Sequence, residues 1–253
     1  MTEISPVLIE APVPFAVNIA EAPVEFSGSM GLLIDAALAF GVDLEEQERE
    51  DWLMMARAVH IIDQHLDEEK TDIMPHIAAM LAGNSIVGIP ESFQDKCRQY
   101  MERQSELRRQ DIIIKLGRVG TLVDQQAATD SVHELIRIRR LEADLMANLL
   151  ALPAFDRPDE AQRKTFNDWL VSISHTGYLV DSFKDLKEDY ESKSSGVEPT
   201  LHTRAVLGGV AAKQTLDTLV KTPKKVFGKI IKVGVKNQIL GKKPDFTNPD
   251  QLI

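Results

Sequence analysis

The sequence has a single cysteine, Cys97, which excludes an internal disulfide and a thiolate metal cluster. No uninterrupted apolar stretch approaches the roughly 20 residues that a membrane-spanning helix needs. The N-terminus lacks a basic stretch followed by an apolar run, so we expect no secretory signal. Basic residues are in the minority, 29 against 39 acidic ones, and the net charge of -10 argues against a nucleic-acid partner. These shortages predict a cytoplasmic protein.

Strand-like alternation of apolar and polar residues is absent as well, and apolar residues recur at helical spacing instead. Four prolines predict an extended arm over residues 1–28. We predict one all-α domain over residues 29–220, followed by a basic tail over residues 221–253. The expected helices cover Met30–Phe40, Leu44–Glu69, Asp72–Ala82, Pro90–Lys115, Val119–Leu150, Pro158–Ser192 and Thr200–Val220.

Aspartates recur at four-residue spacing in two different long helices of this prediction. The first set is Asp63 and Asp67, and the second is Asp181, Asp185 and Asp189. Residues four apart on a helix share a face, and like charges placed there destabilise the helix by roughly 0.2–0.5 kcal/mol per pair. A bound hard cation offsets that repulsion, and magnesium commonly uses carboxylates together with substrate phosphates. The pattern therefore favours a magnesium site.

A purely structural interpretation of the two sets stays open. One Asp-x-x-x-Asp pair is expected by chance in a chain with 39 acidic residues. Lys184 and Lys187 lie inside the second set and can neutralise part of it, as on an ordinary solvated helix face.

The two sets resemble the metal-binding motifs of the class I trans-isoprenoid synthases, which include squalene and phytoene synthases and the class I terpene cyclases. Asp63 and Asp67 are similar to the first motif of the squalene/phytoene synthase branch in its Asp-x-x-x-Asp form. The stretch from Asp185 to Asp189 is similar to that branch's second motif, Asp-x-x-Glu-Asp. Asp181, Asp185 and Asp189 also have the spacing of the terpene-cyclase triad. The resemblance covers most of the predicted helical domain.

The resemblance implies a single helical bundle around a central apolar cavity, in which the five aspartates are catalytic and hold three Mg²⁺ ions. A prenyl diphosphate substrate would lose its diphosphate to these ions, which act as Lewis acids. The chain lacks the Asp-Asp-x-x-Asp motif of chain-elongating synthases and the Tyr-x-x-x-Val-Ala-Gly helix of phytoene synthases. We therefore expect a terpene synthase. The alternatives are a head-to-head condensation of two prenyl diphosphates and a non-catalytic helical protein that binds membrane surfaces.

Arginines that precede the second motif are candidates for substrate binding. Terpene cyclases place a diphosphate-sensing arginine at a comparable distance before this motif, and a guanidinium fork suits phosphate oxygens. We expect Arg137 and Arg140 to fill this role ahead of Arg139. The alternative is a solvated helix face on which these arginines pair with acids such as Glu134 or Glu142.

Three other residues are expected to contact the substrate or to lie beside it. Lys184 lies within the second motif, and Tyr178 precedes it by one turn. His60 precedes Asp63 by three residues, but histidine is a poor magnesium ligand, so we assign it a supporting position. Aromatic residues on helices are more often plain core, and this alternative applies to Tyr178.

The stretch from Lys221 to Lys243 contains eight lysines and no acid. Lys225, Lys229, Lys232 and Lys236 fall on one helical stripe, with apolar residues largely off it. Such a helix can lie on an anionic membrane surface, so we expect peripheral membrane contact through this tail. A helix packed on the acidic body and a lid over the diphosphate are the alternatives.

Overall fold

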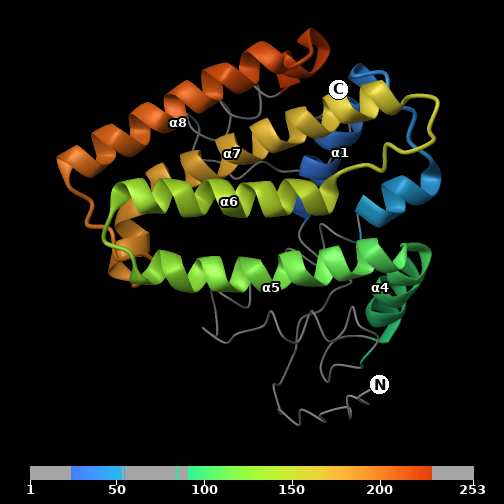
Figure 1. Cartoon of the computed structure of the whole chain (residues 1–253). Coiled ribbons are helices and arrows are strands. Elements are labelled where there is room, and N and C mark those ends of the chain that lie inside the picture. The colour runs from blue at the N-terminus through green and yellow to red at the C-terminus, as the bar shows by residue number, and fades with distance from the viewer. Residues whose placement is uncertain (1–23, 53, 55–83, 85–90, 230–253) are drawn as a thin grey trace.

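The computed structural model describes residues 24–52, 54, 84 and 91–229 (Figure 1). The described residues are helical or irregular and include no strand, which confirms the all-α prediction. Residues 46–52 and 224–229 are helical, and the remaining helices are α1 (Val24–Ala39), α4 (Glu91–Arg103), α5 (Glu106–Ala128), α6 (Val132–Leu150), α7 (Glu160–Glu191) and α8 (Leu201–Lys221).

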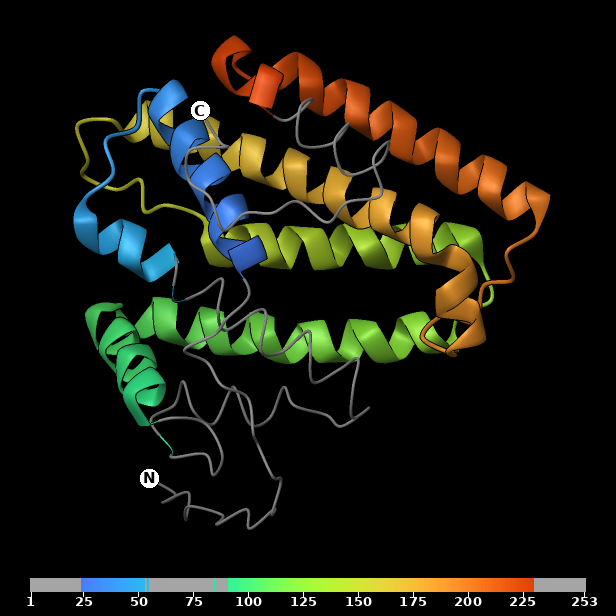
Figure 2. The same cartoon turned by 180° about the vertical axis from the view of Figure 1, so that it is seen from behind.

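The four helices α5, α6, α7 and α8 follow one another in space as they do in sequence. Each packs against the next, and short connections make neighbouring helices antiparallel (Figure 1). α8 lies along α7 at the outer edge of this row, and α1 lies behind α7 (Figures 1 and 2). The second acidic motif lies in the last turns of α7, which bend away from α8 toward the end of α5 (Figure 2).

Several predicted helix boundaries are confirmed. α7 and α8 begin and end within two residues of the predicted limits, and Gly41 follows α1 with a φ of 80°. Such a positive φ favours glycine, and it lets the amide of Val42 donate to the carbonyl of Ala37 at 2.9 Å. The start of α1 differs, because this helix begins at Val24, inside the predicted arm.

One predicted break was wrong. The predicted helix Pro90–Lys115 ends just before Gly117, but α5 runs through this glycine, and the breaks lie at Ser105 and around Ser131. The hydroxyls of these two serines accept hydrogen bonds from the amides of Arg108 and Glu134, which caps α5 and α6. A glycine inside a helix costs only about 1 kcal/mol, so one glycine does not end a helix that has tertiary contacts.

Four aromatic side chains form the centre of one hydrophobic core. Phe166 and Trp169 of α7 pack against each other and against Phe40, and Trp52 stacks on Phe166, with ring centroids 5.6 to 5.9 Å apart. Leu170 and other buried residues surround them. The mutual packing shows that these aromatic residues are core.

A second core lies between α6, α7 and α8 and consists of aliphatic residues. Its members are Val132, Leu135, Ile136, Leu179, Leu186, Val197, Leu207 and Ala211. The second acidic motif therefore borders a packed core on the α6 and α8 sides of α7.

A ladder of buried hydroxyls joins α7 to α8 between the two cores. The hydroxyl of Thr218 lies 2.8 Å from those of Ser172 and Thr176 and donates to the Ser172 carbonyl at 2.9 Å. One turn later, Thr222 accepts a hydrogen bond from the indole of Trp169 at 3.0 Å. Buried polar groups without partners are costly, so this ladder favours one register of α8 on α7.

The loop between α7 and α8 approaches the end of α5 through Gly196. A Cβ at this position would lie 2.6 Å from the carbonyl oxygen of Thr129, closer than van der Waals contact permits. This contact is rigid because both partners, Gly196 and the carbonyl of Thr129, belong to the backbone. Gly209 in α8 differs, because no atom lies within 4 Å of its would-be Cβ.

We predict that Gly196→Ala lowers the free energy of unfolding by about 1–3 kcal/mol, because the loop must move away from α5. Gly209→Ala should raise it by about 0.5–1 kcal/mol, because alanine has the better helix propensity. Urea denaturation followed by circular dichroism measures both. Equal effects of the two substitutions would contradict the close approach at Gly196.

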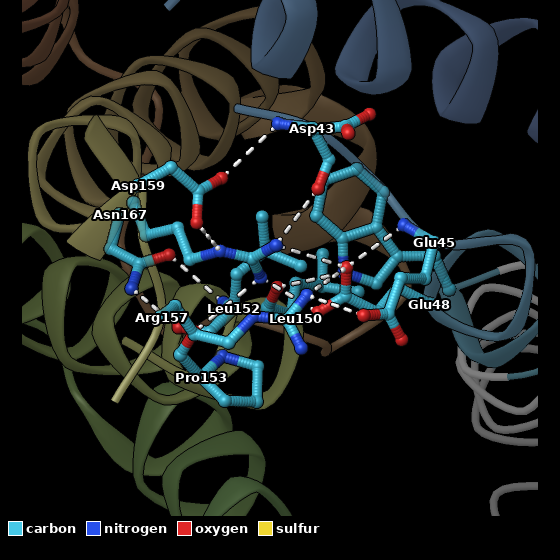
Figure 3. A network of polar contacts seen from close by, with 11 residues as sticks. Asp43, Glu45, Glu48, Leu150, Leu152, Pro153, Arg157, Asp159 and Asn167 are labelled. Atoms are coloured by element: carbon cyan, nitrogen blue, oxygen red, sulfur yellow. Dashed lines mark hydrogen bonds and ion pairs between the residues drawn. The ribbon is translucent and has the colours of Figure 1, made fainter. Parts of the chain in front are cut away.

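A fully buried arginine, Arg163, joins residues 43–48 to the α6–α7 connection. Figure 3 shows the residues of this network, among them Asp43, Glu48 and Asp159. Arg163 Nε donates to Asp159 at 2.7 Å, and Nη1 and Nη2 donate to the two carboxylate oxygens of Glu48 at 2.6 and 3.2 Å. Nη2 also donates to the carbonyl of Asp43 at 2.9 Å, and Nη1 lies 3.4 Å from that of Pro153. The hydrogen bond from Arg163 holds the pKa of Asp159 below its usual range.

We predict that Arg163→Met lowers the free energy of unfolding by about 3 kcal/mol, because two carboxylates lose their buried partner. Arg157→Met is the matched control. Arg157 contacts Glu45 and Glu48 in the same network at 3.0 and 3.5 Å but is partly exposed, so its loss should cost less than about 1 kcal/mol. Similar urea midpoints for the two variants would contradict the central role of Arg163.

Candidate functional site

The first acidic motif lies outside the described residues. Asp63, Asp67 and His60 all fall within residues 55–83. The structure therefore describes the candidate site only at the second motif and the residues around it. The expectation that the two motifs face each other stays a prediction.

The three aspartates of the second motif do not share one environment. Asp181 and Asp185 are exposed, whereas Asp189 is half-buried against α6. Residues four apart on a helix are offset by about 40°, so the ladder turns gradually toward α6 along its length. Asp189 Oδ2 lies 4.0 Å from Nη2 of Arg139. The first two carboxylates thus form a separate exposed pair.

Neither Asp181 nor Asp185 forms an ion pair or hydrogen bond through its side chain within the described part of the chain. Lys187 pairs with Glu191 at 3.5 Å, and Lys184 is exposed without such a partner there. The pKa of Asp181 is raised, chiefly because nearby protein displaces water, and the neighbouring charge of Asp185 adds to the rise. The positive charge of Lys184 acts in the opposite direction. Lys184 thus neutralises part of this charge without a direct ion pair, and the alternative of an ordinary solvated helix face stays open.

Arg139 of α6 is the arginine that reaches the second motif. Its Nε donates to the hydroxyl of Ser182 at 2.8 Å, and its guanidinium lies 5.7 Å from the ring centroid of Tyr178. Nη1 donates to Glu142 at 3.1 Å, and Nη2 faces Asp189. Arg139 therefore links α6 to a stretch of α7 that runs from Tyr178 to Asp189.

Glu142 is the buried acid of this cluster, with 2% of its surface exposed. Burial raises the pKa of its carboxyl, although the charge and hydrogen bond of Arg139 act against this rise. One ion-pair partner, Arg139, thus offsets part of the cost of burying this carboxylate between α6 and α7.

Arg137 and Arg140, the two arginines preferred as diphosphate-binding residues, lie in other surroundings than Arg139. Arg137 donates to its own helix neighbour Glu134 at 2.8 Å, and both lie on an exposed face of α6. Arg140 is also exposed. The signal that singles out Arg139 was in the sequence, because it lies four residues after buried Leu135 and three before Glu142, on the apolar stripe of α6.

Sequence reasoning also missed a second polar pair on the α6–α7 interface. His175 Nε2 lies 2.8 Å from Asp144 Oδ1, two turns before the second motif. Together with Arg139 and Ser182, this pair makes the interface partly polar along its length. No motif marks such a pair in the sequence, because its members come from different helices.

Among the residues that the structure describes, no three histidine, cysteine or acidic side chains gather in a way that could hold a metal ion. Two carboxylates do not complete a magnesium site, so a metal ion at Asp181 and Asp185 would need further groups. No described helix is long and apolar enough to cross a membrane. Comparisons with protein-family models, curated proteins and solved structures give no match to the chain.

We predict that Arg139→Met lowers the free energy of unfolding by about 3 kcal/mol at pH 7, because Glu142 stays buried without its partner. The loss should shrink as the pH falls toward and below 4.5. A carboxyl whose pKa is raised on folding takes up a proton more readily in the folded protein, and protonation removes the unpaired charge.

Two further variants test this origin of the loss. Adding Glu142→Leu to Arg139→Met should recover most of the stability at pH 7, because both charges are then gone. Arg137→Met should leave the urea midpoint unchanged, since its ion pair with Glu134 lies at the solvent-exposed surface. A loss for Arg139→Met that does not depend on pH would show that Glu142 is not its cause.

Proposed function

We propose that this chain is a magnesium-dependent isoprenoid synthase that ionises a prenyl diphosphate and releases diphosphate and a terpene product. The exposed pair of Asp181 and Asp185 on α7 carries the proposal. Within the described residues these carboxylates lack ion-pair partners, and the pKa of Asp181 is raised, chiefly by desolvation and in smaller part by the charge of Asp185. Two neighbouring carboxylates that repel each other are available for a shared cation.

The residues present fit a magnesium ion that is bound together with substrate. Side chains four apart on a helix have Cβ atoms about 6 Å apart, so Asp181 and Asp185 can ligate one ion or two adjacent ones. Magnesium commonly takes one or two carboxylates and completes its shell with phosphate oxygens and water. In this assignment Asp189 is set apart, because Arg139 draws it toward α6.

Bound magnesium would supply Lewis-acid stabilisation of the departing diphosphate. Asp181 and Asp185 fix the position of the ions, and the exposed Lys184 adds positive charge beside them. Arg139 holds Ser182 and the ring of Tyr178 in place through its contacts at 2.8 and 5.7 Å. These contacts keep this part of α7 fixed against α6, which preserves the position of the aspartate pair.

The rest of the proposed site comes from the part of the chain outside the described residues. The proposal requires Asp63 and Asp67 to face Asp181 and Asp185 across an apolar cavity, as in an isoprenoid-synthase-like bundle with three Mg²⁺ ions. Condensation of two prenyl diphosphates is the alternative reaction on the same residues. The number of prenyl chains in the product separates the two reactions.

We predict magnesium-dependent release of diphosphate when the purified chain is incubated with geranyl, farnesyl or geranylgeranyl diphosphate. Asp181→Asn/Asp185→Asn should reduce the rate by roughly 100-fold or more, because the developing charge on the leaving group loses its cation. Asp168→Asn is the matched control, since Asp168 is an exposed acid of the same helix. It should retain wild-type activity.

Analysis of the organic extract identifies the product and distinguishes cyclisation from condensation. Absence of release with every chain length, at any magnesium concentration, would contradict the proposal. If the Asp181→Asn/Asp185→Asn variant were as active as the Asp168→Asn control, the metal site would not involve Asp181 and Asp185 of α7.

A further inference from the structure

One side of α8 presents apolar residues directly to solvent. The buried residues of this helix, among them Leu207 and Thr218, lie on the side that packs on α7. The opposite side has residues at three- and four-residue spacing, which share one face. We call them the outer stripe: Leu201, Ala205, Gly209, Ala212, Leu216 and Val220.

The large members of the outer stripe are among the most exposed apolar residues that the structure describes. Leu201 is 86% exposed, Leu216 is 65% exposed and Val220 is 88% exposed. Ala205, Gly209 and Ala212 between them are also exposed, so the stripe runs the length of the helix without a charged residue. Single exposed apolar residues are ordinary, but a continuous stripe indicates a binding surface.

Basic residues outnumber acidic ones in the segment that carries the outer stripe. Residues 201–228 contain five basic side chains against one acid, Asp217, which gives a local charge of +4. The remainder of the chain therefore has a charge of -14, since the total is -10. The five basic residues are Arg204, Lys213, Lys221, Lys224 and Lys225, all of them exposed.

These five basic side chains also differ from several arginines elsewhere in the chain, which form ion pairs with acidic side chains. In the described part of the chain none of the five forms an ion pair, whereas arginines such as Arg98, Arg103 and Arg109 pair with an acid within 2.7 Å. Lys229, just beyond this stretch, pairs with Asp35 at 2.6 Å. The cations around the outer stripe are therefore available to an external anion.

We propose that the outer stripe of α8 docks on an anionic lipid surface. Leucine and valine side chains enter the boundary between head groups and acyl chains, while the surrounding lysines meet lipid phosphates. The negative charge on the rest of the protein is repelled by the same surface, so only this face is oriented toward it. The inference does not depend on the proposed catalytic activity.

Charge argues against a second copy of the chain as the occupant of the stripe. Two α8 helices packed stripe to stripe about a two-fold axis would bring their basic side chains together. Like charges in one interface are unfavourable, whereas an anionic lipid surface neutralises both flanks of the helix.

A thiol label at the stripe tests the proposal directly. The native Cys97 is fully buried, and burial raises the pKa of its thiol to about 12, so an added cysteine is labelled selectively. Val220→Cys with an environment-sensitive fluorophore should shift to shorter wavelength on phosphatidylcholine vesicles with about 30% phosphatidylglycerol, and not on phosphatidylcholine alone. Leu107→Cys, on exposed α5 surface, should show no shift with either vesicle.

Vesicle sedimentation gives the affinity. Raising the salt from about 0.1 M to about 0.5 M should weaken binding at least tenfold, because the lysine contacts are screened. Leu216→Glu/Val220→Glu should weaken it at least tenfold, and Leu107→Glu should leave it unchanged, provided that circular dichroism shows both variants to be folded.

Three results would overturn the proposal. One is the absence of binding to the anionic vesicles, and another is equal binding by the wild type and the Leu216→Glu/Val220→Glu variant. The third is a concentration-dependent dimer in analytical ultracentrifugation that this variant abolishes, which would assign the stripe to a second copy.

Discussion

The fold depends on one buried charge, the guanidinium of Arg163. It lies at the first turn of α7 and satisfies groups on Glu48, Asp43, Pro153 and Asp159 at once. An arginine side chain has five N–H donors in a fixed planar arrangement, so the acceptors around it must occupy fixed places. The start of α7 is thereby joined to the segment that follows α1. The aromatic core forms directly beside this junction, and α7 extends from it to the acidic motif.

The sequence predicted this architecture to the level of helices but not of contacts. Gly41, Thr200 and the stretch 192–199 gave correct helix ends, because cap residues and the absence of apolar periodicity act locally. The predicted helix end before Gly117 was wrong, because a helix tolerates an internal glycine when the surrounding residues are packed. Arg163 is indistinguishable from a surface arginine in the sequence, because two of its partners, Glu48 and Asp43, lie more than 100 residues away.

The candidate site was predictable to a similar degree. The four-residue spacing placed Asp181 and Asp185 on one exposed side of a single long helix, as the structure has them. The spacing did not separate Asp189 from them, because this depends on Arg139 from another helix. Local periodicity reports which residues share a face, whereas the neighbouring helix decides which members of that face remain accessible.

The hydroxyl ladder between α7 and α8 has a consequence for how these two surfaces relate. Hydroxyl hydrogen bonds are short and directional, unlike contacts between aliphatic side chains, so they resist rotation of one helix about its own axis. The contacts of Thr218 with Ser172 and Thr176, and of Thr222 with the indole of Trp169, therefore fix the rotation of α8 about its axis relative to α7. The acidic pair on α7 and the apolar stripe on α8 are held at a constant angle to each other. When the outer stripe of α8 is docked on a lipid surface, Asp181 and Asp185 therefore have one fixed orientation relative to that surface.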